Sequence, residues 1–427
     1  MTSVRETAEK AKKDSFKMAA LTEEVRNKAL ENIGNSLLSK TEKIVDANKK
    51  DLKNANDMSL AEPLMKRLKF DESKIQEVVN GIKDMINLPD PVGVKLFRKE
   101  LDTDLILNKV SCPIGVIGVI FESRPDALVQ IASLCLKSGN CAVLKGGSEA
   151  ANTNRILFEI IHDAAVKSDI PQSFLTLLET RSDIDELLKC HEFIDLIIPR
   201  GSNEFVKYIM DNSEIAVMGH ADGICHVYAD KDADIEKAVP IIRDSKAQYV
   251  AVCNAVETIL VHKDIKDSLL PALQKKLTES EVTIKGDEET RRVIDVEIAT
   301  NEDFKTEYLD YIVSIKVVND IDEAIDHINT YGSHHTDCIV TEDKEACRKF
   351  MMLVDSAGVY SNCSTRFADG FRYGFGAEVG VSTGKLHARG PVGLEGLVTY
   401  KYELFGNGQI VEDYAEGRKD FHFKNLD

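Results

Sequence analysis

The sequence predicts an α/β fold of two parallel-sheet domains with a small β arm. Strand-like and helix-like segments alternate after Pro113, beginning with GVIGVIFE, a helical stretch over 125–137, and CAVLK. Such alternation favours parallel sheets covered by helices on both faces. A chain of 427 residues also exceeds what one hydrophobic core usually organises. The segment LDTDLILNKVSCP stands outside this rhythm and alternates like an exposed strand, which favours an arm that reaches another subunit.

Hydrophobic periodicity predicts the individual elements. Val25, Ala29 and Ile33 recur every four residues among charged residues, which favours helical structure within 21–56. A second helical stretch, 73–87, ends at the breaker LPDPVG. The later predicted helices cover 125–137, 154–166, 234–245, 265–277, 321–329 and 344–354, and the predicted strands include FLTLLE, FIDLIIP, ICHVYA, ETILVH and CIVT.

Composition limits the classes of function. With 54 basic and 72 acidic residues, the formal charge of -18 argues against a general nucleic-acid or anionic-membrane surface. An anionic substrate would need locally placed arginine or lysine. The chain shows no signal-peptide core and no run of apolar residues long enough to span a bilayer. Nine cysteines without a C-x-x-C pair fit a reduced protein. We therefore expect a soluble cytoplasmic protein that binds neither nucleic acid nor membrane.

Three turns after predicted strands are candidate ligand sites, because open parallel sheets bind ligands at the carboxyl ends of strands. In LKGGSEA and IIPRGSNE, glycines let backbone N–H groups approach a phosphate beside a cationic side chain. An ordinary βα turn with a capping serine explains either segment equally well. In VSCPIGVIGVIFESRPDA the glycines lack the G-x-G-x-x-G spacing, so any dinucleotide binds without that fingerprint. The candidate cofactor-binding residues are Lys145, Gly147, Ser148, Arg200, Gly201 and Ser202.

The histidine-rich segments do not predict a metal site. GHADGICH carries His220, Cys225 and His226, and YGSHHTD carries His334 and His335. Neither segment has a familiar ligand spacing, and no cysteine pair completes a tetrahedral set. The prediction is that the protein holds no metal.

Cys253 lies in QYVAVCNAVET, a short apolar segment between a predicted helix and a predicted strand. Buried cysteines are common and usually inert, so the residues alone favour a packing role.

A glycine-rich segment follows, STRFADGFRYGFGAEVGVSTGKLHARGPVGLEGL, and it cannot form a continuous helix. It predicts loops that close over an anionic ligand, with a purely structural loop as the alternative. Its interleaved cations are Arg366, Arg372, Lys385 and Arg389.

Taken together, these blocks resemble the gamma-glutamyl phosphate reductases of the aldehyde dehydrogenase superfamily. The resemblance runs from about residue 8 to about residue 409, and the most specific block is VNDIDEAIDHINTYGSHHTDCIV over 318–340. VIFESRPDA, LKGGSEAANTN, IPRGSN, GHADGICHVYAD, CNAVET and STRFADGFRYGFGAEVGVST follow the family's other blocks in order. The resemblance implies an aldehyde-dehydrogenase-like fold and reduction of L-glutamyl 5-phosphate by NADPH, which yields L-glutamate 5-semialdehyde and phosphate. This is the second step of proline biosynthesis from glutamate.

The resemblance also implies residue roles. Cys253 corresponds to the nucleophile that carries a thioester, Lys145 to the lysine at the adenosine ribose, and Ser202 to the pyrophosphate site. The activating glutamate of the oxidising aldehyde dehydrogenases has no counterpart at Val217 to Gly219, so hydrolysis of the thioester is expected to be slow. The hypothetical oxyanion donor is Asn254, and the hypothetical substrate-binding residues are Ser123, Arg124, Ser364 and Arg366.

The expected organisation is an NADPH-binding domain of residues 1–98 and 113–229, to which part of 370–400 returns, and a catalytic domain of residues 230–369. Residues 99–112 and 398–427 are expected to form an oligomerisation arm of a homodimer or homotetramer. Lys145 favours NADPH over NADH, although Glu149 nearby weakens that inference. Association with a separate glutamate 5-kinase is a further hypothesis. A reductase for another acyl phosphate or a free aldehyde, and a non-catalytic nucleotide-binding scaffold, are the alternatives.

Overall fold

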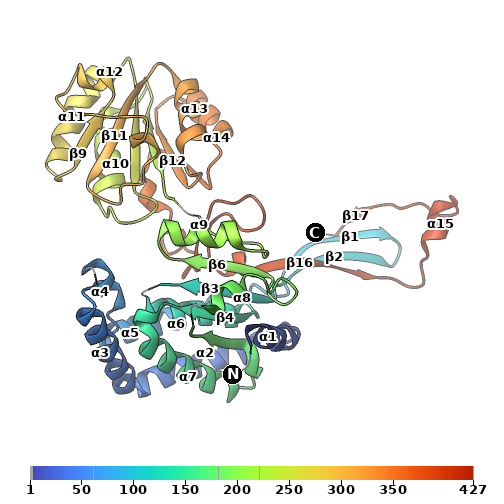
Figure 1. Cartoon of the computed structure of the whole chain (residues 1–427). Helices are drawn as coiled ribbons and strands as arrows, with labels where there is room; N and C mark the ends of the chain where they lie inside the picture. Colours follow the sequence, from blue (N-terminus) through green and yellow to red (C-terminus); the bar gives the residue numbers. More distant parts are fainter. Residues whose placement is uncertain (1–2, 61, 123, 181, 221, 427) are drawn as a thin grey trace.

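The structure is a computed structural model that describes residues 3–60, 62–122, 124–180, 182–220 and 222–426. Two α/β domains and a projecting β arm make up the chain (Figure 1). This confirms the predicted fold class. The candidate functional site lies between the two domains, and the strands of their two sheets position its residues.

The first domain contains a four-stranded parallel sheet in the order β5-β4-β3-β6. Helices α6 and α7 connect β3 to β4 and β4 to β5 and pack against the sheet, with α2, α3 and α5 packed outside them. The connection through α8 returns in the opposite direction, which places it on the other face, where α8 contacts α1. The elements are α1 (Val4–Met18), α2 (Glu23–Ser39), α3 (Thr41–Asp57), α4 (Glu62–Leu68), α5 (Glu72–Ile86), β3 (Val116–Phe121), α6 (Pro125–Lys137), β4 (Cys141–Gly146), α7 (Ala151–Val166), β5 (Leu175–Leu178), α8 (Ser182–Leu187), β6 (Leu196–Arg200) and α9 (Asn203–Asn212).

The second domain contains a seven-stranded parallel sheet in the order β10-β9-β11-β8-β7-β12-β13. One apolar cluster joins α10 and α11 to one face of this sheet, and another joins α13 and α14 to the opposite face. The elements are β7 (Cys225–Ala229), α10 (Ile235–Ala247), β8 (Val256–His262), α11 (Lys266–Thr278), β9 (Thr283–Gly286), α12 (Glu288–Arg291), β10 (Glu297–Ile298), β11 (Ile312–Val318), α13 (Ile321–Tyr331), β12 (Thr336–Val340), α14 (Lys344–Leu353) and β13 (Gly358–Ser361).

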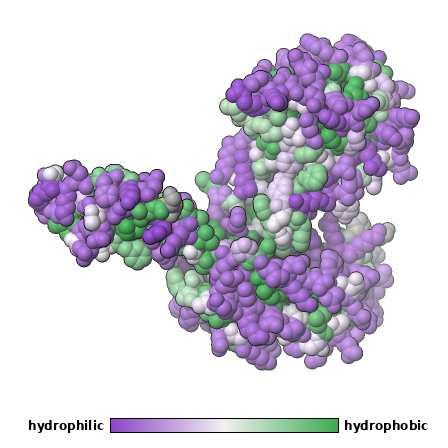
Figure 2. All heavy atoms as spheres, turned by 180° about the vertical axis from the view of Figure 1, so that it is seen from behind, coloured by the Kyte–Doolittle hydropathy of each residue, from purple (hydrophilic) through white to green (hydrophobic). Residues whose placement is uncertain are grey.

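The arm is a four-stranded antiparallel sheet in the order β16-β2-β1-β17. It projects from the first domain, and apolar side chains line part of its surface (Figures 1 and 2). Between the second domain and the arm, the glycine-rich segment forms a small two-stranded sheet whose apolar residues join the core of the first domain. The elements are β1 (Lys95–Asp102), β2 (Leu105–Pro113), β14 (Gly380–Ser382), β15 (Gly390–Val392), β16 (Val398–Phe405), α15 (Val411–Ala415) and β17 (Lys424–Asn425).

Two predicted boundaries differ from the observed strands. The boundary at residue 229 assigned β7 to the first domain, whereas β7 pairs with β8 and β12 in the seven-stranded sheet. A fully buried strand has the same apolar sequence in either sheet, so its composition could not decide between them. The arm also begins earlier than residue 99, because β1 starts at Lys95 and pairs with β2.

Local sequence signals set several helix ends. Ser3 and Glu6 form a reciprocal capping box at the start of α1. Pro125 occupies the first turn of α6, where its missing N–H costs no hydrogen bond. Asp320 caps α13 by accepting from the backbone N–H of Glu323 at 3.0 Å. The proline explains why α6 begins where the predicted helix of 125–137 begins.

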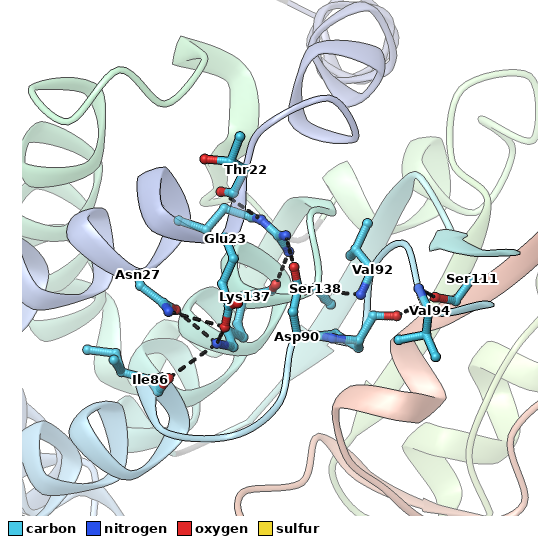
Figure 3. A network of polar contacts seen from close by, with 12 residues as sticks. Thr22, Glu23, Asn27, Ile86, Asp90, Val92, Val94, Ser111, Lys137 and Ser138 are labelled. Carbon is cyan, nitrogen blue, oxygen red and sulfur yellow. Dashed lines mark hydrogen bonds and ion pairs between the residues drawn. The ribbon is translucent and has the colours of Figure 1, made fainter. Parts of the chain in front are cut away.

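A buried network of charges fixes the segment that leads into the arm (Figure 3). The Lys137 Nζ lies 2.9 Å from both Glu23 Oε1 and Asn27 Oδ1. Arg26 donates to the Lys137 carbonyl and pairs with Asp90 at 2.6 Å. The lysine side chain is 0% exposed and the Arg26 side chain 2%. Glu23 and Asp90 keep these two buried cations paired, so the network holds α2, α6 and the root of the arm together.

Within the part of the chain that the structure describes, every helix is too short or too polar to cross a membrane. All nine cysteines are free thiols.

Candidate active site

Three reactive side chains meet at the amino ends of three neighbouring strands. His220 precedes β7, Cys253 precedes β8 and His335 precedes β12, and these strands are adjacent in the order β8-β7-β12. Parallel strands begin at the same edge of a sheet, which brings residues far apart in the sequence together. The Cys253 sulfur and one ring nitrogen of each histidine all lie within 4.8 Å of one another.

The turn that carries Cys253 is held by close backbone contacts. A Cβ added at Gly223 would lie 2.4 Å from the Cα of Cys253 and 2.5 Å from its Cβ, so only glycine fits there. Cys225 donates its thiol to the Cys253 carbonyl at 3.2 Å. The Nδ2 of the buried Asn254 donates to the Ala368 carbonyl at 2.8 Å. These contacts fix the backbone of the thiol residue against two loops.

One hydrogen bond sets the protonation of the His220 ring. Its Nδ1 lies 2.9 Å from the carbonyl oxygen of Val381, and a carbonyl only accepts, so Nδ1 carries the proton. Nε2 is then the nitrogen with a free lone pair. Burial lowers the pKa of His220, against the opposing effects of the Val381 hydrogen bond and the Glu307 carboxylate. His220 is therefore a neutral base at pH 7, next to a thiol.

His335 is the most enclosed of the three. It is 1% exposed, and its Nδ1 lies 2.9 Å from the hydroxyl oxygen of Thr336. Its Nε2 has no hydrogen-bond partner among the described residues. The ring meets that of His220 edge-on, with centroids 4.9 Å apart. His335 thus lies beside the thiol and has an Nε2 with unused hydrogen-bonding capacity.

Two arginine side chains interact electrostatically with the same thiol. The charges of Arg200 and Arg366 both interact with the Cys253 sulfur. Burial lowers the pKa of Arg200, and the charge of Arg124 lowers it further. Arg366 is 7% exposed, and its Nε donates to Gln248 Oε1 at 3.0 Å. Such a group of arginines can bind an anionic acyl substrate through charge-assisted hydrogen bonds.

A buried lysine ends β4 in the first domain. Lys145 is 6% exposed, and its Nζ donates to the next carbonyl at 2.6 Å. Burial lowers the pKa of Lys145, while the carboxylates of Asp183 and Glu149 oppose that shift. A Cβ added at Gly147 would lie 2.1 Å from Glu149 Oε1, so a side chain at this position would displace the flexible Glu149 carboxylate. Ser148 starts the short 3-10 helix Ser148–Ala150 that leads into α7.

The second predicted phosphate turn already binds a carboxylate. The backbone N–H of Ser202 donates to Glu122 Oε2 at 3.0 Å, and a Cβ added at Gly201 would lie 2.5 Å from the same oxygen. A pyrophosphate that used this N–H would have to displace Glu122. Arg200 also interacts electrostatically with Cys253, and its role at the cofactor stays a prediction.

The predicted substrate-binding residues have varied surroundings. Ser123 lies outside the described residues. Arg124 pairs with Asp126 at 2.9 Å. The Ser364 hydroxyl accepts from the backbone N–H of Arg366 at 3.2 Å and thereby caps the 3-10 helix Thr365–Phe367. Contacts of these residues with substrate stay predictions.

Comparison with known proteins connects this geometry with a family. The sequence profile described as "Aldehyde dehydrogenase family" matches residues 2–297. A gamma-glutamyl phosphate reductase from Acetivibrio thermocellus is 59% identical over 424 residues, which cover 99% of this chain and 98% of that protein. One from Methanococcoides burtonii is 50% identical and covers 100% of this chain and 98% of its own length. The crystal structure of gamma-glutamyl phosphate reductase from Thermotoga maritima superposes with a TM-score of 0.94 at 39% identity, covering 95% of this chain and 99% of that one. The chain belongs to the gamma-glutamyl phosphate reductase family.

This member of the reductase family has two site residues that the sequence did not single out as catalytic. In the sequence, His220 and His335 stand out only as candidate metal ligands, and the spacing of the ligand residues within their segments argues against that role. The signal that identifies them is topological, since each immediately precedes a strand that neighbours the Cys253 strand or its partner. Glycine at position 223 was likewise unremarked, although Cys253 packs directly on it.

Proposed function

We propose that the protein reduces L-glutamyl 5-phosphate to L-glutamate 5-semialdehyde, with release of phosphate, in the second step of proline biosynthesis from glutamate. The observation that carries the proposal is the Cys253 thiol, which lies beside a neutral imidazole and within the field of Arg200 and Arg366. A thiol, a base and cations are the groups that attack on an acyl phosphate requires. The 59% identity to a gamma-glutamyl phosphate reductase over nearly the whole chain supports the same substrate.

The first step forms a thioester on Cys253. The sulfur attacks the acyl carbon, the carbon–oxygen bond to phosphate breaks, and the phosphate leaves with that electron pair. Arg200 and Arg366 would stabilise the departing dianion. One N–H hydrogen of Asn254 is donated to Ala368, which leaves its second hydrogen and the backbone N–H of Cys253 as proposed oxyanion donors.

His220 is the proposed acceptor of the thiol proton. The thiolate is the nucleophilic form of cysteine, and a neutral imidazole within 4.8 Å can take its proton directly after a small rotation or through one water molecule. The same proton returns to sulfur when the hemithioacetal collapses and the aldehyde leaves. Val217 to Gly219 include no glutamate that could activate water, so slow hydrolysis of the thioester stays a prediction.

Enzymes of the aldehyde dehydrogenase family use nicotinamide cofactors, and the first domain offers residues that fit one. A glycine turn next to a buried lysine at a strand end suits an adenosine phosphate, because backbone N–H groups can approach the phosphate there. When bound, the nicotinamide supplies the hydride that reduces the thioester. We propose NADPH as the cofactor, held by Lys145, Gly147 and Ser148 at the end of β4 and by Gly201 and Ser202 in the turn after β6.

Replacing Lys145 with methionine should raise the dissociation constant of NADPH by about 10- to 100-fold, the usual loss when a charge-assisted hydrogen bond is removed. Cofactor fluorescence during titration measures that constant without turnover. Affinity for NADH should change little, and the exposed Lys167→Met provides the matched control. An equal loss of affinity for NADPH and NADH would show that the lysine does not bind the ribose phosphate.

The phosphate requirement of the reverse reaction tests the proposed activity. With glutamate semialdehyde and NADP+, turnover should need phosphate, because phosphate is the acceptor that releases the acyl group from Cys253. Formation of NADPH is followed by absorbance with and without phosphate. Turnover that proceeds equally well without phosphate would instead indicate a hydrolytic aldehyde dehydrogenase. No turnover in folded protein that still binds NADPH would support a non-catalytic nucleotide-binding protein.

We further propose that the arm joins copies of this chain into a homodimer or homotetramer. β16 is an edge strand of the arm sheet, and it exposes Tyr402, Leu404 and Phe405 by 57–58%. Exposed apolar edge strands usually pair with another chain. Association with a separate glutamate 5-kinase and a cytoplasmic location stay predictions.

The double variant Tyr402→Glu, Leu404→Glu should reduce the mass in solution to that of one chain, because each charge would be buried at the interface. Light scattering after size-exclusion chromatography measures the mass. Met58→Glu is the control, since Met58 is 81% exposed on helix-rich surface outside the arm. An unchanged oligomer in the double variant would exclude β16 as the interface.

A further inference from the structure

The trio of His220, Cys253 and His335 has the chemical composition of a soft-metal site. Two imidazole nitrogens and one thiolate sulfur are a ligand set that zinc accepts, with a fourth position left for water or an anion. The three ligand atoms lie within 4.8 Å of one another. Bound to one tetrahedral zinc ion, such atoms would be about 3.4–3.6 Å apart, so closure needs movements of about 1 Å.

The hydrogen bonds behind both imidazoles support this composition. Metal-ligating histidines almost always use their second ring nitrogen in a hydrogen bond to a carbonyl, a carboxylate or another polar group. The His220 Nδ1 donates to the Val381 carbonyl, and the His335 Nδ1 lies 2.9 Å from the Thr336 hydroxyl. These contacts orient both rings and leave Nε2 of each as the available ligand atom.

His335 adds an independent observation. Its ring is 1% exposed, yet Nε2 has no hydrogen-bond partner among the described residues. A buried polar atom left unsatisfied costs about 1–3 kcal/mol. A cation coordinated by this nitrogen would remove the cost, because coordination replaces the missing hydrogen bond.

The surrounding charges have opposing effects on the binding of a cation at this site. The guanidinium of Arg200 would repel a cation, whereas the carboxylates of Glu307 and Asp222 interact favourably with positive charge on His220. Cys225, whose sulfur lies 3.8 Å from the His335 Nδ1, is a poor ligand because burial raises its pKa well above the usual value. The sulfur ligand of the trio is therefore Cys253.

We propose that His220, Cys253 and His335 form a binding site for Zn2+ that reversibly blocks the thiol. Binding exchanges the proton of the Cys253 sulfur for a sulfur–zinc bond and releases that proton to solvent. The zinc-bound sulfur can no longer attack an acyl phosphate, so the cation inhibits the enzyme and a chelator restores it. This proposal concerns a metal that stops the chemistry and adds no step to the reaction. Its test reads binding, so it can fail while the proposed reductase activity stands.

Cobalt(II) serves as the spectroscopic probe of the site. Added to the reduced full-length protein after removal of thiol reagents, Co2+ should bind with one equivalent per chain. A sulfur-to-cobalt charge-transfer band in the near ultraviolet and strong visible bands should report a tetrahedral site with one thiolate. Zn2+ should displace the cobalt, and it should slow alkylation of Cys253 by iodoacetamide, measured by mass spectrometry.

Variants locate the metal. Cys253→Ser should remove the charge-transfer band, and His220→Asn and His335→Gln should each weaken binding by about 10- to 100-fold. Two matched controls should bind as the unaltered chain does: Cys363→Ser, and His334→Asn, which tolerates the positive φ of 60° at that position. Circular dichroism confirms folding of each variant. Cobalt spectra without a sulfur band, or binding that Cys253→Ser leaves unchanged, would overturn the proposal.

Discussion

Replacing Cys253 with serine should lower kcat by about 10⁴-fold or more, the scale seen when an essential nucleophile is removed. A serine hydroxyl is far less acidic than a thiol, so the neutral His220 cannot generate a useful fraction of the alkoxide. NADPH should bind to the variant with unchanged affinity, because the predicted cofactor turns belong to the other domain. Steady-state reduction of NADP+ with glutamate semialdehyde and phosphate measures kcat, and cofactor fluorescence measures binding.

Cys363→Ser is the matched control for this experiment. A hydrogen bond from Cys338 lowers the pKa of Cys363 to about 7, so Cys363 is a more acidic thiol than an ordinary cysteine. It nevertheless lies after β13 and outside the group formed by His220, Cys253 and His335. Its replacement should leave kcat within about twofold, because serine is close in size to cysteine and the position lies outside the proposed site. Substantial turnover in Cys253→Ser, or an equal loss in both variants, would remove Cys253 from the proposed mechanism.

The fold class could be predicted because alternating strands and helices leave a local pattern. The helix of 125–137 has a proline in its first turn and apolar residues throughout, and the structure places α6 over the same residues. The sequence of a strand does not show to which of the two sheets the strand belongs. ICHVYA reads as a buried strand wherever it lies, and only its pairing with β8 and β12 assigns it to the second domain.

The candidate site could be predicted only in part for the same reason. Cys253 was identified through resemblance, since its own segment looks like any buried apolar strand entry. Lys145 and Arg200 can be predicted from the turns after strands, because the carboxyl ends of the first sheet point to the site. The second sheet points its amino ends to the site, so His220 and His335 lie before strands, where this rule does not predict ligand residues. Their approach to the thiol depends on the strand order β8-β7-β12, which periodicity does not encode.

The order of the strands also explains the demand for glycine beside the thiol. The loop before β7 and the turn before β8 start at the same edge of the sheet and must pass each other. Gly223 lies at the point where the two segments meet, and a Cβ there would lie 2.3 Å from the Cys253 carbonyl oxygen. This close backbone packing restrains the position of the reacting sulfur beside the two histidines.

Replacing His220 with asparagine should lower kcat/KM by about 100- to 1,000-fold, the usual contribution of a general base. Asparagine can still donate to the Val381 carbonyl, so the loop keeps its hydrogen bond while the base is lost. The pH profile separates this role from a structural one. His220 acts only when neutral, and burial lowers its pKa, so the activity of the unaltered enzyme should decline only below about pH 6.5.

In His220→Asn that acid limb should disappear, and the residual rate should rise with pH because the thiol must ionise without a base. His334→Asn is the control, since the same substitution next to His335 removes a ring whose Nδ1 faces the Asp355 carbonyl and not the thiol. Its pH profile should match that of the unaltered enzyme. A lowered rate in His220→Asn with an unshifted acid limb would mean that the imidazole only positions the loop, and the proton of Cys253 would then need another acceptor.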